Sequence, residues 1–375
     1  MTDPEASRAT PRPSQIGRDC FCYTARMKET GHTTLYRRYR PKKFSEVRGQ
    51  PQVTDTLEKS VRNGKIAHAY LFAGSRGTGK TSVARILARE LGVSDKDLYE
   101  VDAASNRGID DIRLLREGVY AMPFEGKYKF YIIDEAHMLT KEAWNAFLKT
   151  LEEPPAHCIF VLATTDRDRV PETIQSRCEI YAFRQPTREM LADEVASVAK
   201  KEGFTLERSA SELVAILAEG SFRDALSILQ KILAVSEDKK VDVAEVEAVT
   251  GAPRGEYVRT ILAGLASRDA QKALFAIRAA VEENLDVRVL AKLLIHRMRA
   301  VLLLRYAPDL AKRFSQELSE ADFELAKKLS EEPGVNSDIL RALLEAHATM
   351  AYASLPHLPL ELAVIEIASS KSERA

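Results

Sequence analysis

Length, composition and charge limit the classes of protein to which this chain can belong. Its 375 residues are too many for one ordinary hydrophobic core, so we expect two or three domains. Hydrophobic residues make up 45% and charged residues 29%, as in globular proteins, and no apolar run is long enough to cross a bilayer. Lys plus Arg and Asp plus Glu number 55 each, so net charge neither favours nor excludes a nucleic-acid partner.

The N-terminal segment is predicted to lack a fold. Residues 1–34 are rich in Ser, Thr, Pro and Arg and contain no apolar stretch of the kind found in secretory signals. We expect them to form a disordered tail. Met27 is an alternative start, in which case residues 1–26 are not translated.

The chain has four cysteines, Cys20, Cys22, Cys158 and Cys178. They form no pair, and no set with histidines, that has zinc-binding spacing. A reduced, cytoplasmic protein is the simplest interpretation.

A basic run opens the region where we expect folded structure. Residues 36–43 read Tyr-Arg-Arg-Tyr-Arg-Pro-Lys-Lys, with aromatic residues between the cations. This pattern suits phosphate contacts or base stacking, although most charge runs are solvated faces. Contact with DNA is therefore the less common of the two interpretations.

Short apolar segments then alternate with helical periodicity, which is typical of a parallel α/β sheet. We expect strands at 69–72, 98–101, 129–133, 158–163 and 179–183, and helices near 81–91, 110–120, 141–151 and 171–176.

The first strand and helix flank a phosphate-binding motif. Residues 74–81 fit G-x-x-x-x-G-K-[ST], and Ser82 continues into the helix. The loop predicts phosphate contacts from these residues: Gly74, Ser75, Arg76, Gly77, Thr78, Gly79, Lys80, Thr81 and Ser82. Lys80 should reach the β- and γ-phosphates, and Thr81 should ligate Mg²⁺. The sequence therefore predicts a site for a nucleoside triphosphate.

The third strand ends in two carboxylates, Asp134 and Glu135. A phosphate loop needs a neighbouring strand whose terminal Asp completes the Mg²⁺ shell, and a following Glu can activate water. We expect Asp134 to bind the metal and Glu135 to be the general base. His137 completes the box of one helicase family, but a partly buried histidine with satisfied hydrogen bonds is the more common case.

Three later features have both a functional and a purely structural interpretation. Thr165, after the fourth strand, is placed to sense the γ-phosphate or orient water, although Thr is common at strand ends. Arg177 either caps its own helix or projects onto a neighbouring subunit's γ-phosphate, and spacing does not decide between them. Arg223, after the predicted cap Ser221, either reaches the nucleotide or pairs with Asp224.

After Pro186 we expect no further strands. Helices are predicted at 187–201, 209–219 and 223–235, followed by a polar break at 236–240. Seven more are predicted near 243–249, 254–266, 269–282, 286–306, 319–330, 337–352 and 358–368.

Taken together, these motifs resemble the bacterial DNA polymerase III gamma/tau subunits, the ATPases of the clamp loader. The resemblance covers about residues 35–370 and lies in 40–44, 49–50, 74–81, 102–106, 132–137, 148–155, 162–166, 176–178 and 220–226. It implies an AAA+ P-loop domain with a five-stranded parallel sheet at 35–184, a three-helix lid at 185–240 and an all-α oligomerisation collar at 241–370.

The resemblance also implies roles for particular residues. Arg177 becomes an arginine finger acting in trans, Thr165 a first sensor and Arg223 a second sensor. Positions near the adenine are Tyr36, Arg40, Val47 and Arg48.

Two departures from the family are expected. The family's four-cysteine zinc module is missing between Leu91 and Tyr99, so we expect no structural zinc, and the shortened segment is similar to small subunits of replication factor C. The sequence stops after the collar, so we expect no tau-type extension for helicase and polymerase.

The resemblance implies an ATP- and Mg²⁺-dependent motor that loads the sliding clamp onto primed DNA. Its implied partners are delta and delta-prime subunits, further copies of itself, the clamp and primer–template DNA, in a hetero-oligomeric pentamer. The family is conventionally grouped with DNA polymerase, although this chain has no nucleotidyl-transfer site of its own. Alternatives are a loader like replication factor C, a helicase of the Asp-Glu-Ala-His type, or a non-hydrolysing scaffold.

Overall fold

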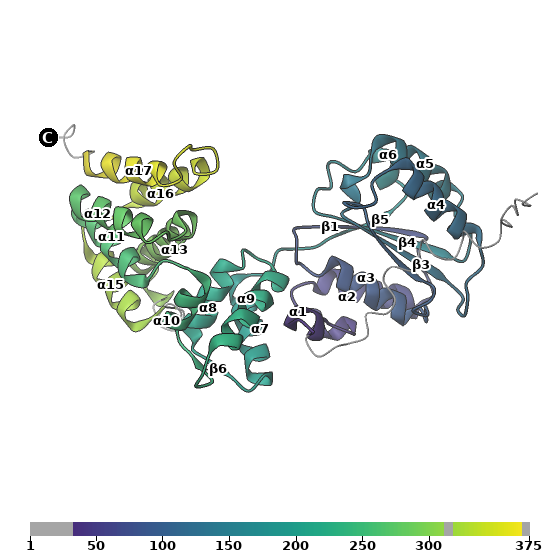
Figure 1. Ribbon diagram of the computed structural model, residues 1–375, viewed down its shortest axis with the longest axis horizontal. Coiled ribbons are helices and arrows are strands. Elements are labelled where there is room, and N and C mark those ends of the chain that lie inside the picture. Colours follow the sequence, from purple (N-terminus) through teal and green to yellow (C-terminus); the bar gives the residue numbers. More distant parts are fainter. Residues whose placement is uncertain (1–32, 311–317, 370–375) are drawn as a thin grey trace, which may run out of the picture.

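The computed structural model describes residues 33–310 and 318–369, and Figure 1 shows a sheet-containing lobe joined to a helical lobe. The tail predicted at 1–34 lies almost wholly outside the described residues. Of the described helices, none combines the length and apolar character needed to cross a membrane.

The first lobe is built on a five-stranded sheet whose paired strands are all parallel. Its order is β2-β3-β4-β1-β5. The strands are β1 Ala69–Ala73, β2 Leu98–Asp102, β3 Lys129–Asp134, β4 Cys158–Thr164 and β5 Glu179–Ala182. All five predicted strands are thus present, and their carboxyl ends meet at one edge of the sheet.

Helices cover both faces of this sheet, which explains why the central strands are continuous apolar runs. Phe72 and Phe130 are fully buried on one face, in a core with α2 Pro51–Arg62 and α3 Lys80–Glu90. Leu71 and Phe160 are fully buried on the other, against α4 Ile109–Tyr120 and α5 Lys141–Glu152. The short helices of this lobe are α1 Leu35–Arg38, η1 Phe44–Glu46, η2 Ala136–Met138 and α6 Glu172–Gln175.

Three helices follow the sheet, and we call them the lid helices: α7 Arg188–Lys201, α8 Arg208–Leu217 and α9 Phe222–Val235. Side chains that accept backbone hydrogen bonds fix where two of them begin, since Thr187 caps α7 and Ser221 caps α9.

The expectation that strands stop after Pro186 is wrong. Strand β6 Thr205–Leu206 pairs in parallel with β7 Lys240–Val241, at the end of the predicted polar break. Two-residue strands are too short to give an alternating pattern, so the sequence carried no signal for them.

The remaining helices run close to the predicted ranges. They are α10 Val243–Thr250, α11 Gly255–Ser267, α12 Ala270–Glu282, α13 Val287–Tyr306, η3 Pro308–Leu310, α15 Glu320–Glu331, α16 Ser337–Thr349 and α17 Leu358–Ser369. Leu290, Leu294 and Met298, spaced four residues apart on one face of α13, are fully buried.

One continuous apolar core joins the lid helices to these C-terminal helices. Leu35 of α1 also lies in it, and its backbone N–H donates to Gln230 Oε1 of α9 at 2.8 Å. Helix α1 therefore packs on the lid helices. The predicted domain boundaries at 184/185 and 240/241 stay predictions.

Candidate nucleotide-binding site

The phosphate loop connects β1 to α3 at the carboxyl edge of the sheet. Gly79 caps α3 with a φ of +102°, a left-handed conformation that favours glycine. Helix α3 begins at Lys80, so its N-terminus, the positive end of its dipole, faces the loop. This local structure is the one that the motif predicted.

Lys80 lies inside the loop. Its Nζ donates to Gly74 O at 2.6 Å and to Ser75 O at 2.9 Å, and the residue is only 6% exposed. Burial lowers the pKa of Lys80, although nearby Glu135 and Asp134 oppose the shift. A buried cation held by two carbonyls gains a stronger partner when a phosphate enters.

Thr81, at the start of α3, contacts Asp134, at the end of β3. Thr81 Oγ1 donates to Asp134 Oδ2 at 3.0 Å. Hydroxyl and carboxylate oxygens are the ligands that Mg²⁺ prefers, with phosphates and waters completing its shell. The pair therefore fits a Mg²⁺ that is brought in with the nucleotide.

Glu135 lies at the centre of a small polar cluster. Its φ of +48° is unusual for a residue other than glycine, and such strain is common at functional sites. Thr165 Oγ1 donates to Glu135 Oε2 at 3.0 Å, and His137 Nδ1 lies 3.4 Å from the same oxygen. His137 Nδ1 also lies 3.1 Å from Thr164 Oγ1. The predicted base and first sensor are thus in direct contact.

A cavity of about 540 Å³ opens between the phosphate loop, the lid helices and the segment from α1 to η1. Predicted site residues that line it are Tyr36, Arg40, Val47, Arg48, Arg76, Gly77, Thr78, Gly79, Lys80, Thr81, Ser82, Asp134, Glu135 and Arg223. Gly74, Ser75, Thr165 and Arg177 are not among the lining residues. A cavity of this size suits a small-molecule ligand.

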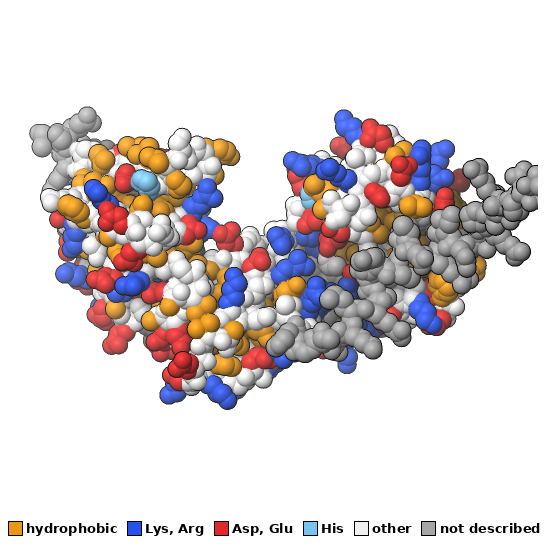
Figure 2. Space-filling model, in the orientation of Figure 1, with side chains coloured by type: hydrophobic (Ala, Val, Ile, Leu, Met, Phe, Trp, Pro, Cys, Tyr) orange, Lys and Arg blue, Asp and Glu red, His pale blue; other side chains and the backbone are white. Residues whose placement is uncertain are grey.

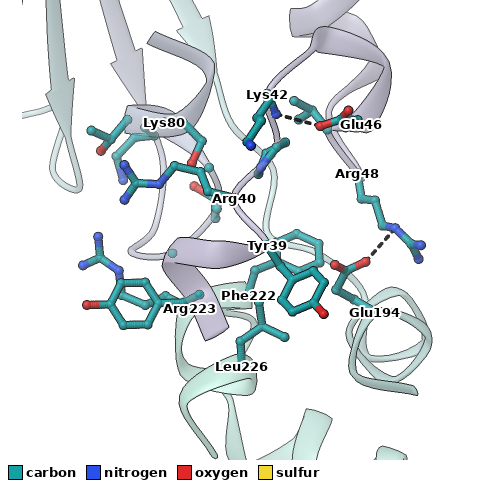
Figure 3. A pocket seen from close by; sticks show the side chains of 18 of the residues that line it. Tyr39, Arg40, Lys42, Glu46, Arg48, Lys80, Glu194, Phe222, Arg223 and Leu226 are labelled. Carbon is teal, nitrogen blue, oxygen red and sulfur yellow. Dashed lines mark hydrogen bonds and ion pairs between the residues drawn. The ribbon is translucent and has the colours of Figure 1, made fainter. Parts of the chain in front are cut away.

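Cations dominate one side of the cavity. In Figure 3, the side chains of Arg40 and Lys80 lie side by side, with Arg223 below them. The guanidinium of Arg223 lies over the Tyr36 ring, with Cζ 5.6 Å from the ring centre. Burial and then nearby Arg85 lower the pKa of Arg40, while Glu100 opposes the shift. These partly desolvated cations favour an anionic ligand such as a triphosphate.

Further lining residues were not predicted from the sequence. Glu194 and Lys201 come from α7, and Phe222 and Leu226 come from α9. Glu194 Oε2 forms an ion pair with Arg48 Nε at 2.8 Å, which joins α7 to the segment that carries Arg48 (Figure 3). These residues stand in ordinary helical patterns, so no motif marked them.

Arg177 lies away from the cavity. Its Nη1 donates to Thr173 O at 2.6 Å, and its Nη2 pairs with Glu152 Oε1 at 2.5 Å. Within one chain the helix-capping interpretation is therefore satisfied. The role in trans stays a prediction, since it needs a second copy.

Among residues 33–310 and 318–369, no group of three or more His, Cys, Asp and Glu side chains is arranged to hold a metal ion. The Mg²⁺ considered above would need the phosphate oxygens of the nucleotide as further ligands.

Fold and site together define a class of protein. A phosphate loop, a strand-terminal Asp-Glu pair, a five-stranded parallel sheet and a helical lid that lines the cavity make this an AAA+ P-loop nucleotide-binding protein.

Family profiles give the particular relationship. The profile described as "DNA polymerase III, delta subunit" matches residues 49–107 and 92–187. The profile described as "DNA polymerase III clamp loader subunit, ATPase lid domain" matches residues 191–238.

Individual relatives agree with the profiles. The chain is 34% identical to DNA polymerase III subunit tau of Bacillus subtilis over 92% of its own length and 64% of that protein. It is 36% identical to subunit gamma/tau of Mycobacterium tuberculosis over 86% of its length and 58% of the relative. For subunit tau of Escherichia coli the identity is 34%, over 74% and 46%. The chain is thus similar to DNA polymerase III gamma/tau subunits over most of its length, and it spans less than two thirds of the length of these relatives.

Solved structures also resemble the chain. The RuvB Holliday junction branch migration motor of Thermotoga maritima has a TM-score of 0.49 and 23% identity, over 60% of this chain and 79% of that one. The DNA clamp loader delta protein of Bacillus subtilis has a TM-score of 0.35 and 17% identity, over 84% and 99%.

Proposed function

We propose that this chain is the ATPase motor subunit of a DNA polymerase III clamp loader, which couples ATP binding and hydrolysis to loading of a sliding clamp onto primed DNA. The observation that carries the proposal is the cavity in which Lys80, Thr81, Asp134 and Glu135 meet Arg223 of the lid. Homology to gamma/tau subunits supports it over most of the chain.

Each residue has a role that follows from its position. The loop amides and Lys80 would hold the β- and γ-phosphates. Thr81 and Asp134 would hold Mg²⁺, which would neutralise charge on the phosphate oxygens. Glu135 accepts a proton from the attacking water, and Thr165 orients the Glu135 carboxylate through its 3.0 Å hydrogen bond. Arg223 binds the phosphates from the lid.

Arg177 is proposed to complete a neighbour's site. It cannot serve its own cavity, since it does not line it and its guanidinium is paired with Glu152. Its side chain retains 34% exposure, so a phosphate on an adjacent subunit can replace the weak surface pair. Arginine fingers contribute about 10³–10⁵ in rate.

Two exposed apolar surfaces suit the protein partners. Between α4 and β3, Met122 and Phe124 are each 74% exposed, while backbone N–H groups of this loop are held by buried Asp97. On α16 and α17, the exposed apolar side chains include Leu344, Leu362 and Ile365. Figure 2 shows apolar side chains gathered along the edge of the molecule where these two helices lie. Exposed apolar surfaces of this kind mark protein–protein contacts.

The proposed partners are delta and delta-prime subunits, further copies of this chain, the clamp and primer–template DNA, in a pentameric complex in the cytoplasm. Purification of the complex from cells, followed by assays of ATP hydrolysis and clamp loading, tests this proposal. We expect hydrolysis that primed DNA stimulates, without strand separation. Unwinding of a duplex would instead favour the helicase alternative, and ATP binding without turnover in the presence of DNA and partners would favour a scaffold.

A further inference from the structure

Gln50 is a fully buried polar residue that the proposed chemistry does not use. It immediately precedes α2, and none of its surface is exposed. Its Oε1 accepts from the backbone N–H of Arg184 at 3.0 Å, and its Nε2 donates to the backbone carbonyl of Arg184 at 2.6 Å. A buried amide that is satisfied in this way has one defined orientation.

The partner of Gln50 lies in the connection between the two lobes. Arg184 stands between the end of β5 at Ala182 and the start of α7 at Arg188. Gln50 therefore binds the connecting backbone through both its N–H and its C=O, as a neighbouring strand would. Among side chains, Asn and Gln carry an N–H donor and a C=O acceptor on one planar group, which this double contact needs.

The same amide also reaches the phosphate loop. Gln50 Nε2 lies 3.5 Å from Thr78 O, at the long limit of a hydrogen bond. A second link runs nearby, since the backbone N–H of Phe222 donates to Gly77 O at 3.1 Å. Phe222 is followed by Arg223, which lines the cavity. The phosphate loop is thus linked both to the connection between the lobes and to the lid helix that carries the arginine.

We propose that Gln50 is a positioning residue that links the phosphate loop to the lid connection, so that Arg223 is held at the phosphates of a bound nucleotide. Without the amide, the connection is released from the loop and the lid no longer fixes Arg223 in the cavity. This inference rests on the proposed function, because it takes the cavity as the ATP site.

A double-mutant cycle on the full chain tests the link. ATP and ADP affinities are measured by calorimetry for the wild type, Gln50→Leu, Arg223→Ala and the double variant. We expect Gln50→Leu to weaken ATP binding about tenfold, as the loss of a net hydrogen-bond contribution near 1.4 kcal/mol would. The double variant should bind no more weakly than Arg223→Ala alone, because Gln50 acts through Arg223.

Control variants separate positioning from a general loss of structure. Gln271→Leu makes the same change at an exposed position on α12, away from the cavity, and should bind ATP as the wild type does. Gln50→Met keeps the length of the side chain but cannot donate to Arg184 O or Thr78 O, so it should reproduce the loss. It replaces Gln50→Leu in the cycle if that variant does not fold.

The outcomes are distinct. Two outcomes would overturn the link while leaving the proposed function intact. One is that the effects of the Gln50 and Arg223 substitutions on affinity multiply in the double variant, and the other is that Gln50→Met binds ATP with wild-type affinity. A wild-type chain that binds no ATP would overturn the proposed function itself.

Discussion

The contact between the phosphate loop and the lid leads to a prediction about two neighbouring glycines. Gly77 and Gly79 both have left-handed backbones, with φ values of +74° and +102°. An added Cβ at Gly77 would overlap Ser221 Oγ and lie 2.8 Å from Ser221 Cβ, whereas a Cβ at Gly79 would meet no atom within 4 Å. Gly79→Ala is therefore a matched control for Gly77→Ala.

The two substitutions should differ in cost. Alanine in a left-handed conformation costs about 1–2 kcal/mol, and both variants pay this. Gly77→Ala must in addition move the start of α9 away from the loop, which adds about 1–3 kcal/mol, the usual range for overpacking. We expect Gly77→Ala to lose about 2–5 kcal/mol of unfolding free energy, against about 1–2 for Gly79→Ala.

Urea unfolding measures this difference. Trp144, the single tryptophan, is 3% exposed in the sheet lobe and reports its unfolding by fluorescence, while circular dichroism follows the helices. Adding Ser221→Gly to Gly77→Ala should restore part of the loss, although it removes the cap of α9. Equal stability of Gly77→Ala and Gly79→Ala would refute the argument that Ser221 and the loop are in packed contact.

Three further predictions concern charge and reactivity. Burial, reinforced by Arg188 and other nearby cations, lowers the pKa of His296 to about 4, so the unfolded state binds the proton first as pH falls. Protonation of His296 should leave the free energy of unfolding unchanged above pH 6.5 and lower it by about 3 kcal/mol towards pH 4. In denaturation measured across this range, His296→Asn should remove most of that decline. Lys80→Ala should weaken ATP binding about 100-fold in calorimetry without lowering the melting temperature, because a buried cation is removed; unchanged affinity would exclude a phosphate role. Burial raises the thiol pKa of Cys158 to about 11 and of Cys178 to about 12, so a Cys20→Ser/Cys22→Ser variant should react with a disulfide reagent at pH 8 only on unfolding, and rapid labelling of the native chain would contradict this burial.

Much of the fold was predictable because long elements repeat a physical pattern. The buried strands are continuous apolar runs, and helix α13 repeats apolar residues at three- and four-residue spacing. Short elements were not predictable, since β6 and β7 contain two residues each. The packing of α1 on the lid helices was not predictable either, because Leu35 contacts a core whose other residues lie more than 150 positions further along the chain.

The site divides in the same way. The phosphate loop and the Asp134-Glu135 pair were predictable because their chemistry demands fixed residue types at fixed spacing. The role of Gln50 was not, although residues 49–50 belong to the family resemblance, because its contacts depend on Arg184, 134 positions away. Arg177 illustrates a second limit. Its contacts within one chain satisfy the capping role, whereas a role in trans depends on a residue arrangement that only two adjacent subunits can form.

Two copies of this chain are proposed to share one hydrolytic site, with Glu135 from one and Arg177 from the other. Mixing Arg177→Ala chains with Glu135→Gln chains in the assembled complex and measuring ATP turnover tests it most directly. Each variant alone should bind ATP and turn it over at a small fraction of the wild-type rate, whereas the mixture should recover activity at sites where an intact Glu135 faces a neighbour's Arg177. A mixture no more active than its components would contradict the shared site.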